Sequence, residues 1–172
     1  MIETAPAFSG IAKPDLESIF QQHYNRVARV IARVVRDRGR AEDLAVEVFL
    51  RLCKKPEAHP NLEAWLNRAA VRIGLDELRR RTRRDRYERL SKVFRPPNPE
   101  EIRAAEEEQE RVRGVLARMD RVKAELLVLR SDGLSYAELA SALELNPASV
   151  GKLLSRAQDS FRKEYVRRYG TY

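Results

Sequence analysis

The sequence has little of what disulfide-bonded or metal-binding proteins and common enzymes need. Its 172 residues include one cysteine, Cys53, and two histidines, His23 and His59. A single cysteine excludes an internal disulfide framework and a thiolate metal cluster. The two histidines are isolated in the sequence, and no glycine-rich phosphate-binding loop is present. We therefore expect no cofactor, no metal site and no enzymatic activity.

Long apolar runs are absent as well. No stretch of the sequence approaches the ~18 apolar residues that a membrane span needs. The first residues, MIETAPAFSGIAKPD, lack both the basic start and the apolar core of a secretory signal. The sequence therefore predicts a protein with no membrane insertion and a cytoplasmic location.

Positive charge, by contrast, is in excess. The formal net charge is +8 and the isoelectric point is about 9.9, which suits a polyanionic partner. Residues 1–95 carry 21 Lys and Arg against 13 Asp and Glu, whereas residues 96–172 carry 13 of each. Six arginines lie between positions 79 and 86 with Asp85 as the only acidic residue, and their repulsion predicts an anionic partner. Charge alone fits DNA, RNA or an anionic membrane.

The apolar residues recur at helical spacing almost throughout, and no segment alternates like a strand. Asp15 and Asn61 are expected to cap helices, Gly39 to end the first helical region, and Phe20 to face inward. The pattern predicts helices at about residues 15–36, 40–54, 62–90, 101–118, 120–131, 135–143 and 147–168.

The segment FRPPNPEE, residues 94–101, divides the chain. Its three prolines in four residues favour a stiff, extended connector. Residues 99–110 then carry a net charge of −5, from six Glu and one Arg. The sequence thus predicts an all-α protein of two small helical modules, residues 15–93 and 111–170, joined by a Pro-rich acidic linker, residues 94–110.

Two short helical patterns meet at a tight corner near Glu144. Ser135 and Glu138 have the spacing of a capping box. Asn146 is a candidate N-cap, and Pro147 occupies the first position of the next helix. This spacing is typical of a helix-turn-helix, whose second helix enters the major groove. A helical hairpin that only closes a small core is the alternative. If the segment is a helix-turn-helix, the residues on its exposed side would contact phosphates and base edges: Ala148, Ser149, Lys152, Ser155 and Arg156.

Together with the N-terminal module, these motifs resemble the sigma-70 family, specifically its extracytoplasmic-function (ECF) group with only regions 2 and 4. AEDLAVEVFLRL (Ala41–Leu52) is similar to the segment that grips the β′ clamp helices of RNA polymerase. NLEAWLNRAAVRIGLDELRRRTRR (Asn61–Arg84) is similar to the helix that melts and reads the −10 promoter element. GLSYAELASALELNPASVGKLLSRAQ (Gly133–Gln158) is similar to the −35 reader. The resemblance covers about residues 20–84 and 112–162.

The resemblance implies that core RNA polymerase is bound through the β′ clamp helices and the β flap. Asp43 and Glu47 are four residues apart, so their carboxylates share a helix face. A solvated charged face over a core stripe is the alternative. Val48 and Phe49 add the apolar part of the implied polymerase-binding set.

The resemblance also implies binding of the melted −10 strand, which needs cations for phosphates and a pocket or platform for flipped bases. Trp65 is a candidate platform, with a core position as the alternative. The implied −10 residues are Lys54, Lys55, His59, Asn61, Arg68, Arg72, Arg79, Arg80, Arg83 and Arg84. The acidic linker would run through polymerase channels as a nucleic-acid mimic, or be only a solvated helix start.

Four positions depart from the family pattern. Val46 stands where Gln is usual, Arg72 where Asn is usual, and Glu144 where Gly is common. Gly151 lies where the reading helix commonly has a basic-Ser-Arg run. These departures leave two alternatives open: a helix-turn-helix regulator that binds duplex DNA without polymerase, and a degenerate sigma-like protein that binds polymerase without starting transcription. The resemblance further implies an anti-sigma factor as a partner.

Overall fold

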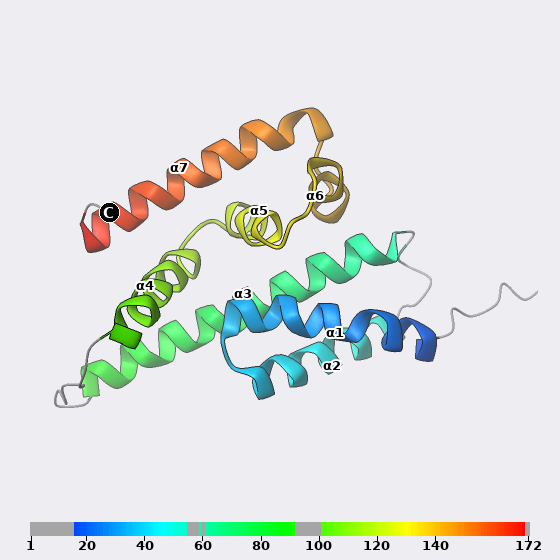
Figure 1. Ribbon diagram of the computed structural model, residues 1–172, viewed down its shortest axis with the longest axis horizontal. Coiled ribbons are helices and arrows are strands. Elements are labelled where there is room, and N and C mark those ends of the chain that lie inside the picture. Colours follow the sequence, from blue (N-terminus) through cyan, green and yellow to red (C-terminus); the bar gives the residue numbers. More distant parts are fainter. Residues whose placement is uncertain (1–15, 55–58, 60, 92–100, 171–172) are drawn as a thin grey trace, which may run out of the picture.

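The structure is a computed structural model that describes residues 16–54, 59, 61–91 and 101–170 (Figure 1). These residues form no strand, so the all-α class is confirmed. None of the helices in these ranges is both long and apolar enough to cross a membrane. The helices are α1 (Leu16–Val35), α2 (Arg38–Lys54), α3 (Leu62–Ser91), α4 (Glu101–Leu116), α5 (Arg121–Ser131), α6 (Tyr136–Leu143), the 3₁₀ turn η2 (Pro147–Ser149) and α7 (Val150–Tyr169).

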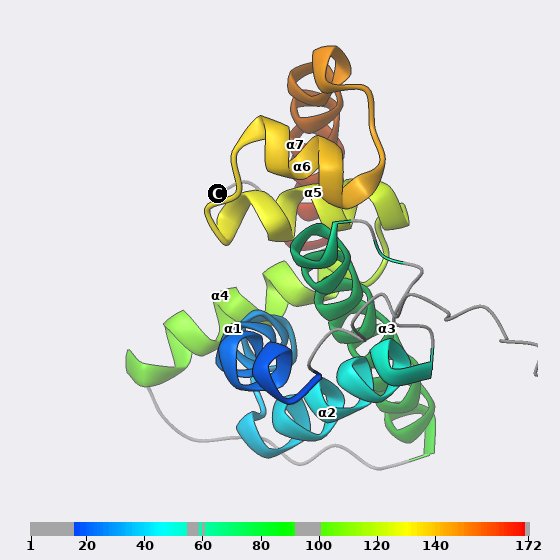
Figure 2. The same ribbon diagram turned by 90° about the vertical axis from the view of Figure 1, so that its right-hand side faces the viewer.

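The long helix α3 lies between the two halves of the molecule (Figures 1 and 2). On one side it packs against α1 and α2, which also pack against each other. On its other side it contacts α5 and α6, and α7 covers α5. The buried apolar residues of both halves form one contiguous cluster. The two predicted modules are therefore packed against each other along α3.

The corner between α1 and α2 differs from the prediction. The backbone of Arg36 enters the left-handed region, with φ of 51°, and ends α1. Asp37 then caps α2, because its Oδ1 accepts a hydrogen bond of 3.0 Å from the backbone N–H of Arg40. Gly39 consequently lies inside the first turn of α2, and the expectation that it ends the helical region is wrong.

Phe20 was expected to face inward but is 37% exposed. Its ring lies 4.8 Å from that of Tyr24 and 4.9 Å from that of the buried Phe49, measured between centroids. Phe20 and Tyr24 are four residues apart on α1, so both rings cover Phe49 from the solvent side. Phe20 therefore lies over the edge of the core and not within it.

The corner at Glu144 has the predicted caps. The hydroxyl of Ser135 accepts from the backbone N–H of Glu138, and the Glu138 carboxylate accepts from the N–H of Ser135, at 3.3 and 2.7 Å. Asn146 Oδ1 accepts from the N–H of Ala148 at 3.0 Å. Because both caps form as the sequence predicts, α6 and α7 meet at the expected tight turn.

Glu77 of α3 accepts hydrogen bonds from three arginines. Its carboxylate is reached by Arg40 at 3.2 Å, Arg80 at 3.3 Å and Arg81 at 3.4 Å. Arg81 also donates to Asp37 at 2.9 Å. The hydrogen bond from Arg40 is the main reason that the pKa of Glu77 lies below its ordinary value. The arginine run is thus partly neutralised inside the protein at Arg80 and Arg81.

Replacing Glu77 by Gln should lower the free energy of unfolding at pH 7 by about 1–3 kcal/mol, because three guanidinium groups lose a buried charged acceptor. Since the folded-state pKa is lowered, the carboxylate stabilises the fold above its unfolded-state pKa, and this contribution is lost as the pH falls through the lower folded value. The difference between wild type and variant should therefore shrink below about pH 4.

Urea unfolding across that pH range measures this difference. Glu42→Gln is the matched control, because it removes a carboxylate that pairs with Arg38, four residues away on the surface of the same helix. The control should change the free energy of unfolding by less than about 0.5 kcal/mol. Equal effects of the two substitutions would contradict the role of Glu77.

Candidate nucleic-acid interface

The implied polymerase-binding residues of α2 divide between surface and core. The side chain of Asp43 is 74% exposed, and Glu47 is exposed with its carboxylate accepting from Arg51 at 2.6 Å. Val48 and Phe49 are 0% and 5% exposed and belong to the core. The structure therefore places only the two carboxylates where a partner protein can touch them.

Two apolar residues that sequence reasoning did not select lie beside these carboxylates. Val46 and Leu50 are 42% and 57% exposed. With Asp43 and Glu47 they have the spacing i, i+3, i+4, i+7, which puts all four on one helical face, called the α2 face below. The signal was present in the sequence, because a buried stripe through Leu44 and Val48 turns Val46 and Leu50 outward.

The start of α3 carries the described part of the implied base-capture loop. Lys54 is exposed at the end of α2, whereas Lys55 lies outside the described residues. The ring of His59 stacks on that of Trp65 with centroids 4.2 Å apart, and Trp65 is half-buried against the core. Asn61 caps α3, since its Oδ1 accepts from the N–H of Ala64 at 3.0 Å. The structure thus places two aromatic side chains together at this end of α3.

The implied −10 arginines of α3 also divide into two groups. Arg80, Arg83 and Arg84 are exposed toward the end of the helix, although Arg80 is held by Glu77. The other three, called the inner arginines, point toward the C-terminal half of the protein: Arg68, Arg72 and Arg79.

Each inner arginine is bound by the C-terminal half. Arg68 forms an ion pair with Glu144, and Arg72 Nε donates to Glu125 Oε1 at 2.9 Å. The guanidinium group of Arg79 donates to the backbone carbonyls of residues 117 and 119 at 3.3 and 3.2 Å. Three of the residues that the resemblance assigns to the −10 strand are therefore bound by intramolecular acceptors.

The two carboxylates that hold these arginines are in different environments. Glu125 is fully buried, and its Oε2 has no hydrogen-bond partner among the residues that the structure describes. Glu144 is exposed and adopts a left-handed conformation with φ of 55° at the end of α6. The hydrogen bond from Arg68 lowers the pKa of Glu144. The Glu125 carboxylate is thus removed from water with one oxygen lacking a hydrogen bond, whereas Glu144 has a backbone conformation that favours glycine.

The predicted −35 residues lie together at the start of α7. Ser149 is half-buried in the 3₁₀ turn that precedes the helix. Ala148, in the same turn, is exposed, and three exposed residues follow in the first turns of α7: Lys152, Ser155 and Arg156. The arrangement presents one Lys, one Arg and two hydroxyls in the part of a recognition helix that reaches base edges and phosphates.

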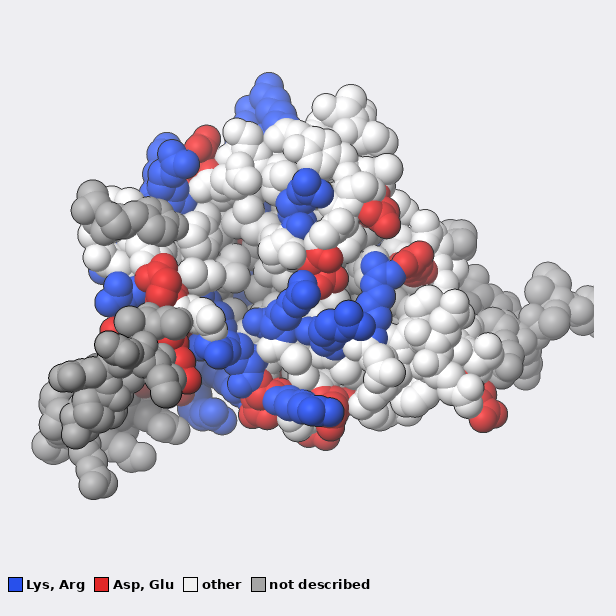
Figure 3. All heavy atoms as spheres, in the orientation of Figure 1, with Lys and Arg blue, Asp and Glu red and all other residues white. Residues whose placement is uncertain are grey.

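A further basic area lies on α1, where sequence reasoning had selected nothing. Lys and Arg side chains gather across the middle of the face seen in Figure 3, over the position of α1. A hollow of about 540 Å³ there is lined by four arginines of the α1–α2 corner together with Gln109 of α4: Arg29, Arg33, Arg36 and Arg38. Arg29, Arg33 and Arg36 are three or four residues apart in the sequence, which predicts that they share one exposed side of the helix.

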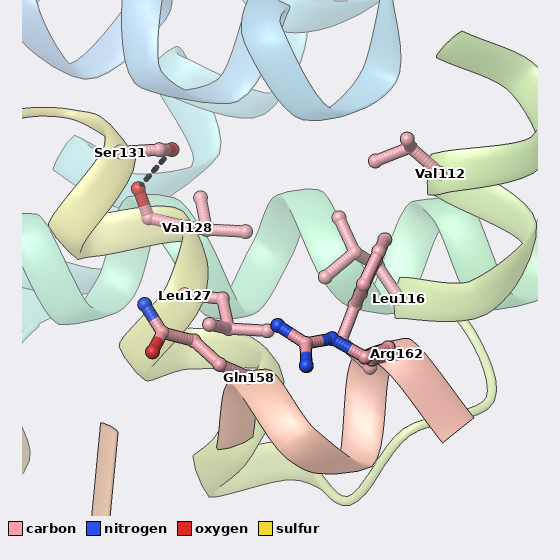
Figure 4. A pocket seen from close by; sticks show the side chains of 8 residues that line it. Val112, Leu116, Leu127, Val128, Ser131, Gln158 and Arg162 are labelled. Atoms are coloured by element: carbon pink, nitrogen blue, oxygen red, sulfur yellow. Dashed lines mark hydrogen bonds between the residues drawn. The ribbon is translucent and has the colours of Figure 1, made fainter. Parts of the chain in front are cut away.

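The C-terminal half also contains an apolar groove of about 740 Å³ between α4, α5 and α7 (Figure 4). Leu116, Leu127 and Phe161 contribute much of its lining, and Arg162 extends along one wall. The Ser131 hydroxyl at its edge donates to the carbonyl of Val128 at 2.8 Å. The groove is therefore mainly apolar, as expected for a site that accepts a partner's side chains.

Comparison with known proteins accounts for both halves. Residues 19–84 match the family model for Sigma-70 region 2, and residues 109–157 match that for Sigma-70, region 4. The ECF RNA polymerase sigma factor SigK of Mycolicibacterium vanbaalenii is 30% identical over 166 residues, which cover 88% of this chain and 82% of SigK. The chain belongs to the sigma-70 family, in its ECF group. In this family's terms, α1–α3 contain region 2, and the region 4 match runs from the second half of α4 into α7.

Other relatives are longer than this sigma-70 family member. The ECF RNA polymerase sigma factor SigE of Mycolicibacterium smegmatis is 27% identical over 168 residues, covering 93% of this chain and 65% of SigE. The probable RNA polymerase sigma factor RfaY of Xanthomonas campestris pv. campestris is 27% identical over 158 residues, covering 86% of this chain and 40% of RfaY. The chain thus spans less than two thirds of the length of these two relatives.

Two solved structures share the fold. CnrH, in complex with the cytosolic domain of CnrY, aligns with a TM-score of 0.54 and 20% identity over 89% of this chain and 88% of CnrH. The sigma factor RpoE of Bartonella quintana, in complex with the anti-sigma factor NepR, aligns with a TM-score of 0.51 and 16% identity over 90% of this chain and 98% of RpoE. At these identities the comparison establishes the fold.

Gly151 in the recognition helix should tolerate a side chain. A Cβ at this position would meet the Tyr136 ring at 3.5 Å, which is ordinary contact. Gly151→Ala should therefore raise the free energy of unfolding by up to about 1 kcal/mol. In the control Gly133→Ala, a φ of 98° makes any side chain strained, so stability should fall by roughly 1 kcal/mol or more. Urea unfolding of both variants checks the pair, and a loss of stability in Gly151→Ala would contradict the geometry.

Proposed function

We propose that this protein is an ECF sigma factor that binds core RNA polymerase, recognises −35 and −10 promoter elements and promotes promoter opening. The observation that carries the proposal is the succession of matched regions 2 and 4 in one chain. The protein acts by binding and not by catalysis. Its affinity for the melted strand shifts the equilibrium from duplex toward open DNA. A cytoplasmic location, where promoter DNA and polymerase are found, belongs to the same proposal.

Each half of the protein has its own proposed binding role. Residues 15–93 bind polymerase and the −10 element, residues 94–110 link the halves, and residues 111–170 read the −35 element. The β′ clamp helices dock on the α2 face, where two carboxylates flank two exposed apolar side chains. Val46 and Leu50 take the contact role that Val48 and Phe49 were expected to have, because the latter pair is buried.

The apolar groove of region 4 is the proposed site for the β flap. Its lining comes from three helices, and it is formed by the part of α7 that follows the recognition face. A flap segment seated there leaves Lys152 and Arg156 free for DNA. The two contacts of region 4 are therefore spatially compatible.

An anti-sigma factor is a further proposed partner. CnrH and RpoE, which share the fold, were each solved with a bound partner, the cytosolic domain of CnrY and the anti-sigma factor NepR. The exposed α2 face and the region 4 groove offer apolar surface for a comparable protein. Co-purification from cells under several growth conditions tests this point, and repeated failure to recover a partner would count against it.

In-vitro transcription tests the function. Purified core polymerase and a genomic fragment library are incubated with and without this protein, and transcript starts are mapped. New starts with shared upstream elements are expected. Polymerase binding without new transcripts would instead identify the degenerate sigma-like alternative. A helix-turn-helix regulator, which the match to region 2 does not favour, would shift duplex DNA without polymerase.

Reversing charge on the α2 face should abolish polymerase binding. In Asp43→Arg with Glu47→Arg, both exposed carboxylates become cationic while the core beneath is unchanged, so the fold should persist. Binding to core polymerase, measured by fluorescence anisotropy, should fall by at least about 100-fold, since like charges facing each other disfavour association by several kcal/mol. Asp85→Arg with Asp159→Arg makes the same change in charge elsewhere and should retain binding. Unchanged binding in the first variant would remove the clamp assignment.

Arg156→Ala should weaken use of −35-dependent promoters. If the guanidinium group reads a base, the loss is about 1–3 kcal/mol and specificity relaxes at one position; a phosphate contact gives a smaller, uniform loss. Promoter competition in transcription assays separates these two results. Arg167→Ala, at the far end of α7, is the matched control and should behave as wild type.

A further inference from the structure

The basic hollow at the α1–α2 corner has no role in the proposed function as stated so far. Its volume is about 540 Å³, and arginines from both helices and from the turn between them line it. Because α1 buries Val27, Ile31 and Val34, its arginines Arg29 and Arg33 stand on the outer side of the helix. Figure 3 shows the resulting concentration of Lys and Arg over α1.

A second hollow, of about 260 Å³, continues the first along α1 and α2. Arg29, Ala32 and Arg38 line both hollows. Ala28 and Ala41 also line the second, so small side chains lie between the arginines of the two helices. The two hollows together form one groove, called the corner cradle below. Small side chains between cationic walls leave room for the backbone of a charged polymer.

Two of the four arginines in the corner cradle have their charge available. In the part of the chain that the structure describes, Arg29 and Arg36 are exposed and form no ion pair. The other two form ion pairs at the surface, at 2.6 and 3.0 Å: Arg33 with Asp132, and Arg38 with Glu42. Exposed pairs of this kind are individually weak, so all four guanidinium groups can contribute to attraction of an anion.

The backbone at Arg36 is a second observation at this corner. Its φ of 51° lies in the left-handed region, where glycine is favoured and other residues are strained. The turn needs this conformation, because it ends α1 with a hydrogen bond of 2.8 Å from the N–H of Arg36 to the carbonyl of Ala32. The position thus carries an unpaired cation at a cost in strain that glycine would avoid. Strain of this kind at an exposed residue indicates a function for the side chain.

The carboxylate that lines the hollow does not cancel this charge. Asp37 accepts hydrogen bonds from the backbone N–H of Arg40 at 3.0 Å and from the Arg81 guanidinium at 2.9 Å, and both lower its pKa. Arg81 also donates to the carbonyl of Val35 at 3.4 Å. Asp37 is therefore engaged toward α3, and the arginine run of α3 begins directly beside the corner cradle.

The lining of the corner cradle favours one class of ligand. Guanidinium groups match phosphates in shape and charge. Proteins that hold single strands add aromatic platforms, and membrane-binding surfaces add apolar side chains. Among the described residues that line the larger hollow, none is aromatic and Ala32 is the only apolar one. Tyr24, at the far end of the smaller hollow, packs its ring against that of Phe20 with centroids 4.8 Å apart.

We propose that the corner cradle binds the phosphate backbone of duplex DNA and adds affinity for promoters without reading their sequence. The proposal rests on the proposed function for the source of the duplex, which polymerase and the promoter bring to region 2. The cradle lies beside the α3 arginines, so it extends the basic surface of region 2 around the end of the helix pair.

Polymerase docking on the α2 face is compatible with an occupied corner cradle. Arg38, Ala41 and Glu42 have the spacing i, i+3, i+4 and share the cradle side of α2. The α2 face, which contains Val46 and Leu50, lies on a different side of the same helix. A partner bound to the α2 face therefore leaves the cradle side of α2 uncovered.

Photocrosslinking identifies what occupies the corner cradle. The full chain carries a photoreactive phenylalanine analogue in place of Arg33 and is irradiated with core polymerase and promoter duplex. Crosslinks to DNA are expected. The same analogue in place of Arg167, at the far end of α7, is the control and should not crosslink to DNA. Crosslinks to a polymerase subunit alone would identify a protein ligand, and either that result or no crosslink would overturn the proposal.

Salt dependence measures the contribution of the two unpaired arginines. Arg29→Gln with Arg36→Gln breaks no ion pair and keeps a side chain in the same backbone conformation, so the fold should persist. Binding of the full chain to a random-sequence duplex is followed by fluorescence anisotropy at several low salt concentrations. The slope of log K against log salt should become shallower by about 2, and affinity at the lowest salt should fall at least about five-fold.

The matched control is Lys163→Gln with Arg167→Gln, which removes two exposed cations from α7 and gives the same net charge. Its slope should equal that of wild type. Equal losses in the two variants would show a general charge effect, and an unchanged slope in the cradle variant would show that phosphates are not bound there. Either result overturns the proposal. Far-UV circular dichroism and urea unfolding establish that the variants are folded.

Promoter complexes separate this proposal from the proposed function. With core polymerase, the cradle variant should bind polymerase as wild type does and lose the same factor in affinity for promoters of different sequence, because a backbone contact carries no sequence information. A loss confined to some promoters would overturn a sequence-independent role. If wild type forms no promoter complex with polymerase, the proposed function fails, while the duplex measurement on the protein alone still decides whether the cradle binds phosphates.

Discussion

Burial of α3 on two sides is the constraint on which the rest of the structure depends. Its apolar residues, such as Val71 and Leu75, are fully buried between the N-terminal helices and the C-terminal ones. The same helix carries arginines at the edges of these faces, and a buried or half-buried guanidinium group needs an acceptor. Glu77 provides it toward α2, and Glu125 and Glu144 provide it toward α5 and α6. Packing of the two regions on α3 therefore brings arginines of α3 next to carboxylates of the neighbouring helices.

That constraint links fold to function. The proposed function assigns arginines of α3 to the single strand, and three of them, Arg68, Arg72 and Arg79, contact the C-terminal half in this structure. Lys54 and Arg83 are exposed in this structure and contribute to a basic surface. The outward recognition helix and α2 face are also open. Under the proposed function, polymerase engages the α2 face and duplex DNA engages the recognition helix.

Local features of the fold were predictable from the sequence because they depend on neighbours in the chain. The seven helices follow from apolar periodicity, and the caps at Ser135 and Asn146 follow from side chains three or fewer residues away. The corner at Gly39 was missed because Asp37, two residues earlier, supplies the cap. The prediction of the exposed polymerase-binding residues on α2 was partly wrong, because apolar residues such as Val48 and Phe49 can lie either on a binding surface or in the core. Only the packing of α1 and α3 decides which side of α2 is buried. The ion pairs of Arg68 and Arg72 join residues 76 and 53 positions apart, a relationship that no local pattern encodes.

The measurement that tests the account most directly is permanganate reactivity of promoter DNA taken from the mapped start sites. Thymines near −10 react only when unpaired and unstacked. With core polymerase and this protein together, the account predicts strong reactivity over the −10 region and none with either component alone. Transcript-supporting complexes that leave those thymines unreactive, or reactivity produced by this protein without polymerase, would contradict it.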